Sequence, residues 1–155
     1  MARLSGREAL IVEALRTPMG KAHPDRGWYR DTHPNELLGA VYDALLASTG
    51  LSPSAVEDLV IGCTAPFGEQ SRNIARNAWL QAGYPAEVPA TVLDRRCGSA
   101  QTAVEMADKL RQMRQDGQSG GFCQLHLYHC PSSGYHPTSG FHRFSIRWRQ
   151  SREKP

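Results

Sequence analysis

The sequence predicts an α/β fold, in which helices are layered on an incomplete mixed sheet in residues 1–113 and an irregular tail follows over residues 114–155. Strand-like and helix-like segments alternate in the first part, an order typical of layered architectures with a partly parallel sheet. Regular apolar spacing then stops near residue 113. Residues 1–113 carry twelve Lys and Arg against thirteen Asp and Glu, whereas residues 114–155 carry six against two, so the charge balance changes at the same point.

The first predicted elements are a short strand and a long helix. Residues 9–12 form an apolar strand, which a nearby proline ends because proline lacks a backbone donor. Thr32 or His33 caps a helix that starts at Pro34, and Gly50 ends it. The apolar stripe of this helix consists of Leu37, Leu38, Val41, Leu45 and Leu46.

Three more elements are predicted before the third helix. Ser52 starts a short capped turn that leads into an apolar strand over residues 59–61. Asn73 caps a helix that ends at Gly83. A buried strand follows over residues 89–94.

Cys97 is the most informative residue, because a strand over residues 89–94 precedes it and residues 97–107 read as a tight turn that enters a helix. Unpaired backbone N–H groups and the positive end of the helix dipole favour the thiolate there, and the thiolate is the nucleophilic form. The small neighbours that permit close approach of other backbone or of a ligand are Gly98, Ser99, Ala100 and Ala103. Because free cysteine is also a common buried residue, the spacing alone fits packing as well as catalysis.

The sequence around Cys97 points to a family. Residues 92–104 resemble the acyl-enzyme cysteine motif of thiolases, the acyl-CoA C-acyltransferases. Three further segments resemble parts of these enzymes in the same order: residues 8–21 their opening strand and turn, 56–63 their second strand, and 73–83 the following helix. The resemblance covers residues 7–113 and implies a partial thiolase-like layered fold for that stretch.

The resemblance also implies a chemistry. Cys97 would be the nucleophile that forms an acyl thioester, with coenzyme A or an acyl-CoA as substrate and no bound cofactor or metal. The reaction would be thiolysis of a 3-ketoacyl-CoA or the reverse condensation of acetyl-CoA, as in fatty-acid β-oxidation or sterol side-chain degradation.

The same resemblance implies that catalytic groups are missing. Thiolases take their other acid/base and oxyanion groups from blocks in their C-terminal half, including Gly-His-Pro and Cys-x-Gly-Gly-Gly. Neither motif occurs in these 155 residues. Tyr135-His136-Pro137 does not match the first motif, because tyrosine stands where the glycine should be. We therefore expect a truncated and inactive fragment or, alternatively, a non-catalytic assembly partner of a full-length thiolase subunit.

The tail over residues 114–155 is expected to be disordered, because it lacks the apolar pattern that offsets ordering entropy. A reading-frame shift near residues 113–118 is the simplest explanation of the break. The less favoured alternative is a zinc-binding module, although the ligand spacing matches no standard zinc motif. Its four candidate ligands are Cys123, His126, His129 and Cys130.

Other candidate residues have plainer explanations. Cys63 is expected to pack in the core, and His23 and His33 are expected to be solvated loop residues. Arg95 and Arg96 fit either a contact with a CoA phosphate or a role at the solvent or between subunits.

Composition excludes several classes of function. The net charge of +3 is too small and too unclustered to indicate a nucleic-acid partner. No apolar run approaches ~20 residues, so no membrane span is predicted. The first residues lack an apolar secretion segment and the four cysteines are expected to be reduced, which together predict a cytoplasmic protein. Because an incomplete sheet has an open edge, we expect a homo-oligomer or pairing with a thiolase subunit.

Overall fold

The computed structural model describes residues 11–18, 20–21, 23, 25–115 and 128–129. Its elements, in chain order, are α1 (Pro34–Thr49), β1 (Leu59–Cys63), α2 (Ile74–Gln81), β2 (Ala90–Leu93), α3 (Ser99–Gln115) and β3 (Tyr128–His129). Two short 3₁₀ turns, Pro53–Ala55 and Gly68–Gln70, lie on either side of β1. The predicted α/β class is confirmed.

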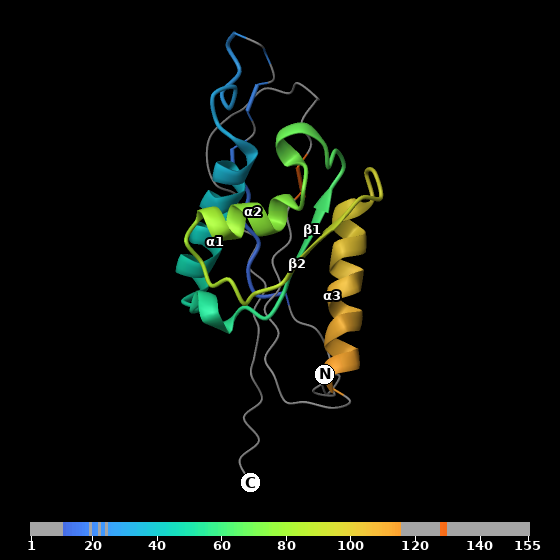
Figure 1. The fold of residues 1–155 in the computed structure, drawn as a ribbon. Coiled ribbons are helices and arrows are strands. Elements are labelled where there is room, and N and C mark those ends of the chain that lie inside the picture. The colour runs from blue at the N-terminus through green and yellow to red at the C-terminus, as the bar shows by residue number, and fades with distance from the viewer. Residues whose placement is uncertain (1–10, 19, 22, 24, 116–127, 130–155) are drawn as a thin grey trace, which may run out of the picture.

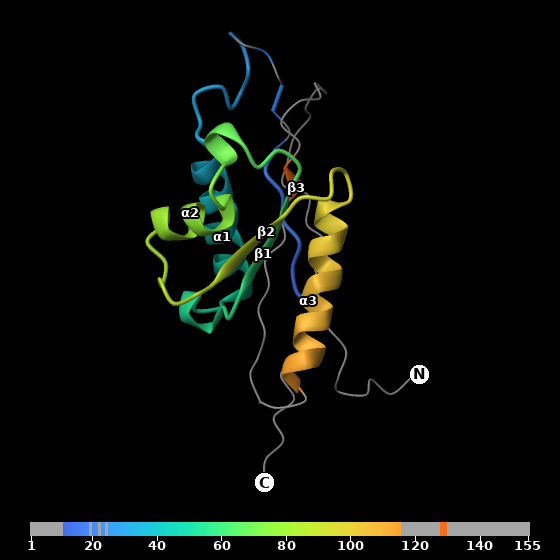
Figure 2. The ribbon, with the colours of Figure 1, turned by 45° about the vertical axis from the view of Figure 1, so that its right-hand side comes forward.

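The described strands form a three-stranded sheet in the order β2-β1-β3, and both pairings are parallel. Leu59 to Gly62 of β1 pair with Ala90 to Leu93 of β2, and α2 makes the crossover between them. The two residues of β3 pair with Gly62 and Cys63, beside the carboxyl end of β1 (Figure 2). β2 therefore lies at one edge of the described sheet.

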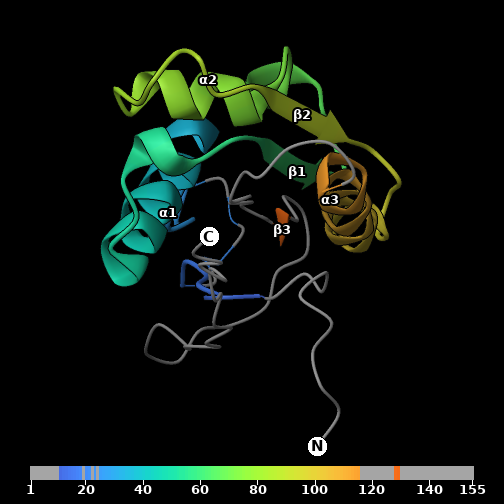
Figure 3. The same ribbon diagram turned by 90° about the horizontal axis from the view of Figure 1, so that it is seen from below.

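Helices cover both faces of this sheet. α1 and α2 lie on one side of β1 and β2, and α3 lies on the other (Figures 1 and 3). Alternate side chains of β1 explain this arrangement, because Leu59, Ile61 and Cys63 join the core under α1 and α2. All five residues of β1 are buried, as expected for a central parallel strand.

The helix α1 begins and ends where the sequence predicts. The His33 side chain accepts the backbone N–H of Asn35 at 3.1 Å, and Gly50 closes the helix in the left-handed conformation, with φ of 68°. Most of the predicted apolar stripe is buried, but Leu37 is only half-buried. Tyr42, which the predicted stripe omits, is fully buried.

Trp79 of α2 is the centre of the core. Its side chain is fully buried, and its Nε1 donates to the carbonyl of Pro85 at 2.8 Å. The ring meets Tyr42 edge-on with centroids 5.5 Å apart and Tyr84 at 4.5 Å. These contacts hold α1, α2 and the loop before β2 together, and aromatic pairs of this kind add stability beyond their buried area.

Two predicted segments differ from the structure or lie partly outside it. Ile11 and Val12 do not form a strand, and Ile11 is 49% exposed; residues 9–10 lie outside the described residues. α3 continues to Gln115, past the predicted boundary at residue 113. Apart from β3 and the end of α3, the tail lies outside the described residues.

Candidate active site

The parallel strands bring several connecting segments to one end of the molecule. The turn over residues 94–98, the loop over residues 64–71 and the long loop before α1 all lie at the carboxyl end of β1 and β2 (Figure 1). In open α/β sheets, ligands usually bind outside the carboxyl ends of the strands. Cys97 belongs to this group of segments.

Cys97 lies in a short turn between β2 and α3. The helix starts at Ser99, so the thiol is two residues before its first turn, and the residue is exposed. The carbonyl of Gly98 already accepts the first helical hydrogen bond, from Thr102 N–H at 3.0 Å. The predicted placement of Cys97 at a helix N-terminus is confirmed, and its thiol is free and open to reagents.

Polar side chains from both sides hold this turn. The Asp94 carboxylate accepts the N–H of Arg96 at 2.9 Å, and Arg96 adopts a left-handed conformation with φ of 51°. Ser99 is only 1% exposed; its Oγ accepts the N–H of Arg95 at 2.8 Å and donates to the carbonyl of Arg96 at 2.7 Å. These two roles are not among those predicted from the sequence, although an aspartate whose side chain binds the backbone two residues later is a known turn signal.

Gly62 of β1 lets α3 approach the sheet closely. A Cβ at this position would lie 2.5 Å from the backbone of both Ser99 and Ala100. Over residues 99–110 of α3 the buried positions are Ser99, Ala103 and Ala107, one small residue every four, which matches this close contact. The small residues near Cys97 therefore serve the contact between α3 and the sheet, and a glycine inside an apolar strand is the signal for such an approach.

The two arginines of the turn differ in their contacts. The Arg95 guanidinium donates to Thr102 Oγ1 at 2.9 Å, a contact on the exposed surface of α3. The backbone of Arg96 forms hydrogen bonds within the turn, and Arg96 is exposed. Both arginines therefore lie at the surface of the turn.

Cys63 is in the core, as predicted. It is 2% exposed, and its Sγ lies 3.5 Å from Gln70 Oε1, to which it donates. A small cavity of about 50 Å³ lies beside it and is lined partly by Thr17, Pro34 and Gln70. That volume suits one or two water molecules and is far below the ~300 Å³ or more of a typical ligand pocket.

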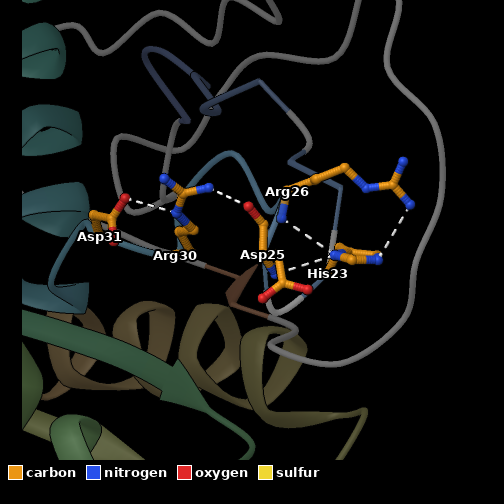
Figure 4. Close-up of polar contacts among 5 residues, drawn as sticks. All are labelled: His23, Asp25, Arg26, Arg30 and Asp31. Atoms are coloured by element: carbon orange, nitrogen blue, oxygen red, sulfur yellow. Dashed lines mark hydrogen bonds and ion pairs between the residues drawn. The ribbon is translucent and has the colours of Figure 1, made fainter.

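The histidines of the long loop are engaged in local hydrogen bonds. His23 Nδ1 accepts the N–H groups of Asp25 and Arg26 at 3.1 and 3.2 Å, and the Arg26 guanidinium lies 3.3 Å from His23 Nε2 (Figure 4). Arg30 binds the Asp31 carboxylate at 2.8 Å and also donates to the carbonyl of Asp25. These contacts shape the loop itself, and His33 caps α1.

The described residues also bear on the predictions about metal and membrane. Groups of three or more metal-ligating side chains are absent from the described part of the chain. Three of the four predicted zinc ligands, Cys123, His126 and Cys130, lie outside that part, and His129 is in β3. Among the helices of the described residues, none combines the length and apolar character that crossing a membrane requires.

Comparison with known proteins agrees with this geometry. The family model for the thiolase N-terminal domain matches residues 9–116. The chain is similar to a steroid 3-ketoacyl-CoA thiolase of Mycobacterium tuberculosis, with 43% identity over 97 residues, covering 63% of this chain and 23% of that protein. It is also similar to peroxisomal 3-ketoacyl-CoA thiolase 5 of Arabidopsis thaliana, with 36% identity over 133 residues, covering 84% of this chain and 29% of that protein. The chain thus spans about a quarter of the length of these curated relatives.

A solved structure supports the fold independently. The crystal structure of the Bacillus anthracis acetyl-CoA acetyltransferase matches with a TM-score of 0.57 and 24% identity. The match covers 68% of this chain and 26% of that chain. The described layers of helix and parallel sheet are therefore those of part of that larger structure.

Proposed function

The chain belongs to the thiolase family, and from this premise we propose that Cys97 is the nucleophile that accepts an acyl group from an acyl-CoA. The observation that carries the proposal is the position of the thiol. Cys97 is exposed in an ordered turn at the carboxyl end of the sheet and just before α3, inside the segment that the family model matches. An accessible thiol at a helix N-terminus is the arrangement that nucleophilic cysteine chemistry needs.

The proposed step is a thioester exchange. The Cys97 sulfur attacks the carbonyl carbon of the acyl-CoA, a carbon–sulfur bond to Cys97 forms, and the bond to CoA breaks. The proton lost by Cys97 is balanced by the proton that the departing CoA thiolate takes up. The products are acyl-Cys97 and free coenzyme A, with no change of oxidation state.

We further propose that the 155-residue chain does not complete thiolysis on its own. Cleavage of a 3-ketoacyl-CoA also needs a base, an acid for the enolate carbon and oxyanion donors. The family's Gly-His-Pro and Cys-x-Gly-Gly-Gly motifs, which supply such groups, do not occur in this sequence. Acyl transfer to Cys97 is thus the partial reaction that this chain retains.

Mass spectrometry tests the nucleophile. The chain is incubated with acetyl-CoA, and peptide mapping is used to locate any added acetyl group. We expect the acetyl group on the Cys97 peptide, no labelling of the buried Cys63, and loss of the label in Cys97→Ala. An unlabelled Cys97 in the folded chain would refute the proposal.

A second candidate function is assembly with a full-length thiolase subunit. It is favoured by β2, which has one strand neighbour among the described strands and so presents an unpaired edge. Mixing the chain with a complete thiolase subunit and following its mass by light scattering tests this candidate. Elution of the two as separate species would exclude it.

We also propose three features that come from the sequence. They are a division of the chain at residues 113/114 caused by a shifted reading frame, a zinc-binding site in the tail as the less favoured alternative, and a cytoplasmic location. The first is tested by reading the DNA after codon 113 in all three frames, since a shift requires a thiolase-like continuation in another frame. Metal analysis of the purified chain tests the second, and cell fractionation tests the third.

A further inference from the structure

We propose that Ser99 is the positioning residue for Cys97, a role that rests on the proposed nucleophilic function of that thiol. Ser99 is two residues after Cys97 and is 1% exposed. Its side chain binds the turn before Cys97 instead of solvent. In this arrangement the nucleophile is placed by a buried hydroxyl on the helix that follows it.

The two hydrogen bonds of Ser99 Oγ fix the backbone on the N-terminal side of Cys97. The hydroxyl accepts from Arg95 N–H at 2.8 Å and donates to the Arg96 carbonyl at 2.7 Å. The Gly98 and Ser99 N–H groups also bind the carbonyls of Arg95 and Arg96, both at 3.0 Å. Hydrogen bonds within residues 95–99 therefore hold the backbone on both sides of Cys97. Removal of the Ser99 hydroxyl would leave the N–H of Arg95 without its acceptor.

The sheet fixes Ser99 in turn. The backbone of Ser99 and Ala100 lies directly against Gly62 of β1, where even a methyl group would come within 2.5 Å. Gly62 is held in register by its pairing with Leu93 of β2. β1 thus contacts the backbone of Ser99, and the Ser99 side chain binds the turn, so the position of Cys97 depends on the sheet.

The other side-chain bond of this turn is weaker as a constraint. Arg95 donates to Thr102 Oγ1 at 2.9 Å, but this contact is exposed to solvent, and water can replace it. The Ser99 hydroxyl is shielded from water, so its loss is not compensated in the same way. Thr102→Ala is therefore a matched control, because it removes a bond to the same arginine from the same helix.

The test measures alkylation of each cysteine by iodoacetamide near ~pH 7, with peptide mapping of wild type, Ser99→Ala and Thr102→Ala. In wild type, Cys97 should react faster than Cys63, which is buried. Ser99→Ala should slow Cys97 by about two- to fivefold, the factor expected when a favourable helix-terminus position is lost. Cys63 should stay slow in both variants, and Thr102→Ala should leave the Cys97 rate unchanged.

Two results would overturn the proposal: an unchanged Cys97 rate in folded Ser99→Ala, or an equal effect of Thr102→Ala. Rapid alkylation of the buried Cys63 would show that Ser99→Ala does not fold. In that case, amide hydrogen exchange of the wild-type protein tests the positioning role instead. The Arg95 amide should then be protected, and exchange at the rate of an unstructured amide would refute its bond to Ser99. Failure of acetyl transfer to Cys97, with these results intact, would reject the proposed function and leave the positioning role standing.

Discussion

Tyr84 illustrates how one residue links two elements and titrates with the fold. Its ring packs on Trp79, and its hydroxyl donates to the Asp43 carboxylate of α1. Desolvation, the hydrogen bond to Asp43 and the charge of that carboxylate, in this order of size, together raise the pKa of Tyr84 from its usual 10.0 to about 12. Burial also raises the pKa of Tyr42, which is fully enclosed in the core.

These shifts predict a loss of stability in alkali. A phenol whose pKa is higher in the folded than in the unfolded state holds its proton to a higher pH when the protein is folded. Its contribution to the free energy of unfolding is therefore complete below ~pH 10 and is lost as the pH rises towards about 12. We expect the urea midpoint of wild type to fall across this window. The midpoint of Tyr84→Phe should fall less steeply, and Tyr42 contributes to the remaining loss. Parallel curves for the two proteins would show that Tyr84 does not contribute.

At the level of elements, the contact between β1 and α3 limits which side chains are tolerated. Gly62→Ala would place a methyl group 2.5 Å from backbone atoms of α3, so the helix must move. We expect a loss of ~1–3 kcal/mol in the free energy of unfolding, measured with urea, as for an overpacked core.

Gly39→Ala is the matched control for that substitution. Gly39 is also buried, but its new methyl group would come no closer than 3.7 Å to another side chain, Ala82. Because alanine favours a helix interior, this variant should gain ~0.5–1 kcal/mol. Equal stabilities for the two variants would contradict the close packing of α3 on β1.

The start of α1 gives a second prediction at this scale. His33→Ala removes the acceptor for the Asn35 N–H and should cost ~0.5–2 kcal/mol. His33→Asp keeps an acceptor and adds a negative charge at the helix N-terminus, so it should be at least as stable as wild type. Thermal melts of wild type and the two variants check this, and equal stability of His33→Ala and wild type would argue against the cap.

For the whole molecule, the proposed function predicts acyl transfer without turnover. The purified chain should not cleave acetoacetyl-CoA above the background of Cys97→Ala, as followed by loss of the substrate's absorbance. Each missing acid/base or oxyanion function typically costs ~100-fold or more, and several are missing together. Cleavage that disappears in Cys97→Ala would show that the chain contains a base that has not been identified.

The sequence determined the features that depend on neighbouring residues. The caps at His33, Ser52 and Asn73, the central strand and the helix after Cys97 all follow from short-range rules, and the structure contains each of them. The placement of Cys97 before a helix was predictable for the same reason. The family was recognisable from the order of the segments, and the match over residues 9–116 confirms it.

Only the tertiary structure decided the features that depend on distant contacts. Ile11 and Val12 are as apolar as a strand requires, yet they form none, while the two residues of β3 pair with β1 from far along the chain. The roles of Ser99 and Gly62 also depend on distant contacts. A glycine inside an apolar strand signals a close approach, but it does not show which backbone approaches, and nothing local shows that the Ser99 hydroxyl binds the turn before it. Periodicity shows which residues prefer burial, but which backbone lies 2.5 Å from Gly62 is set by how helix and sheet pack.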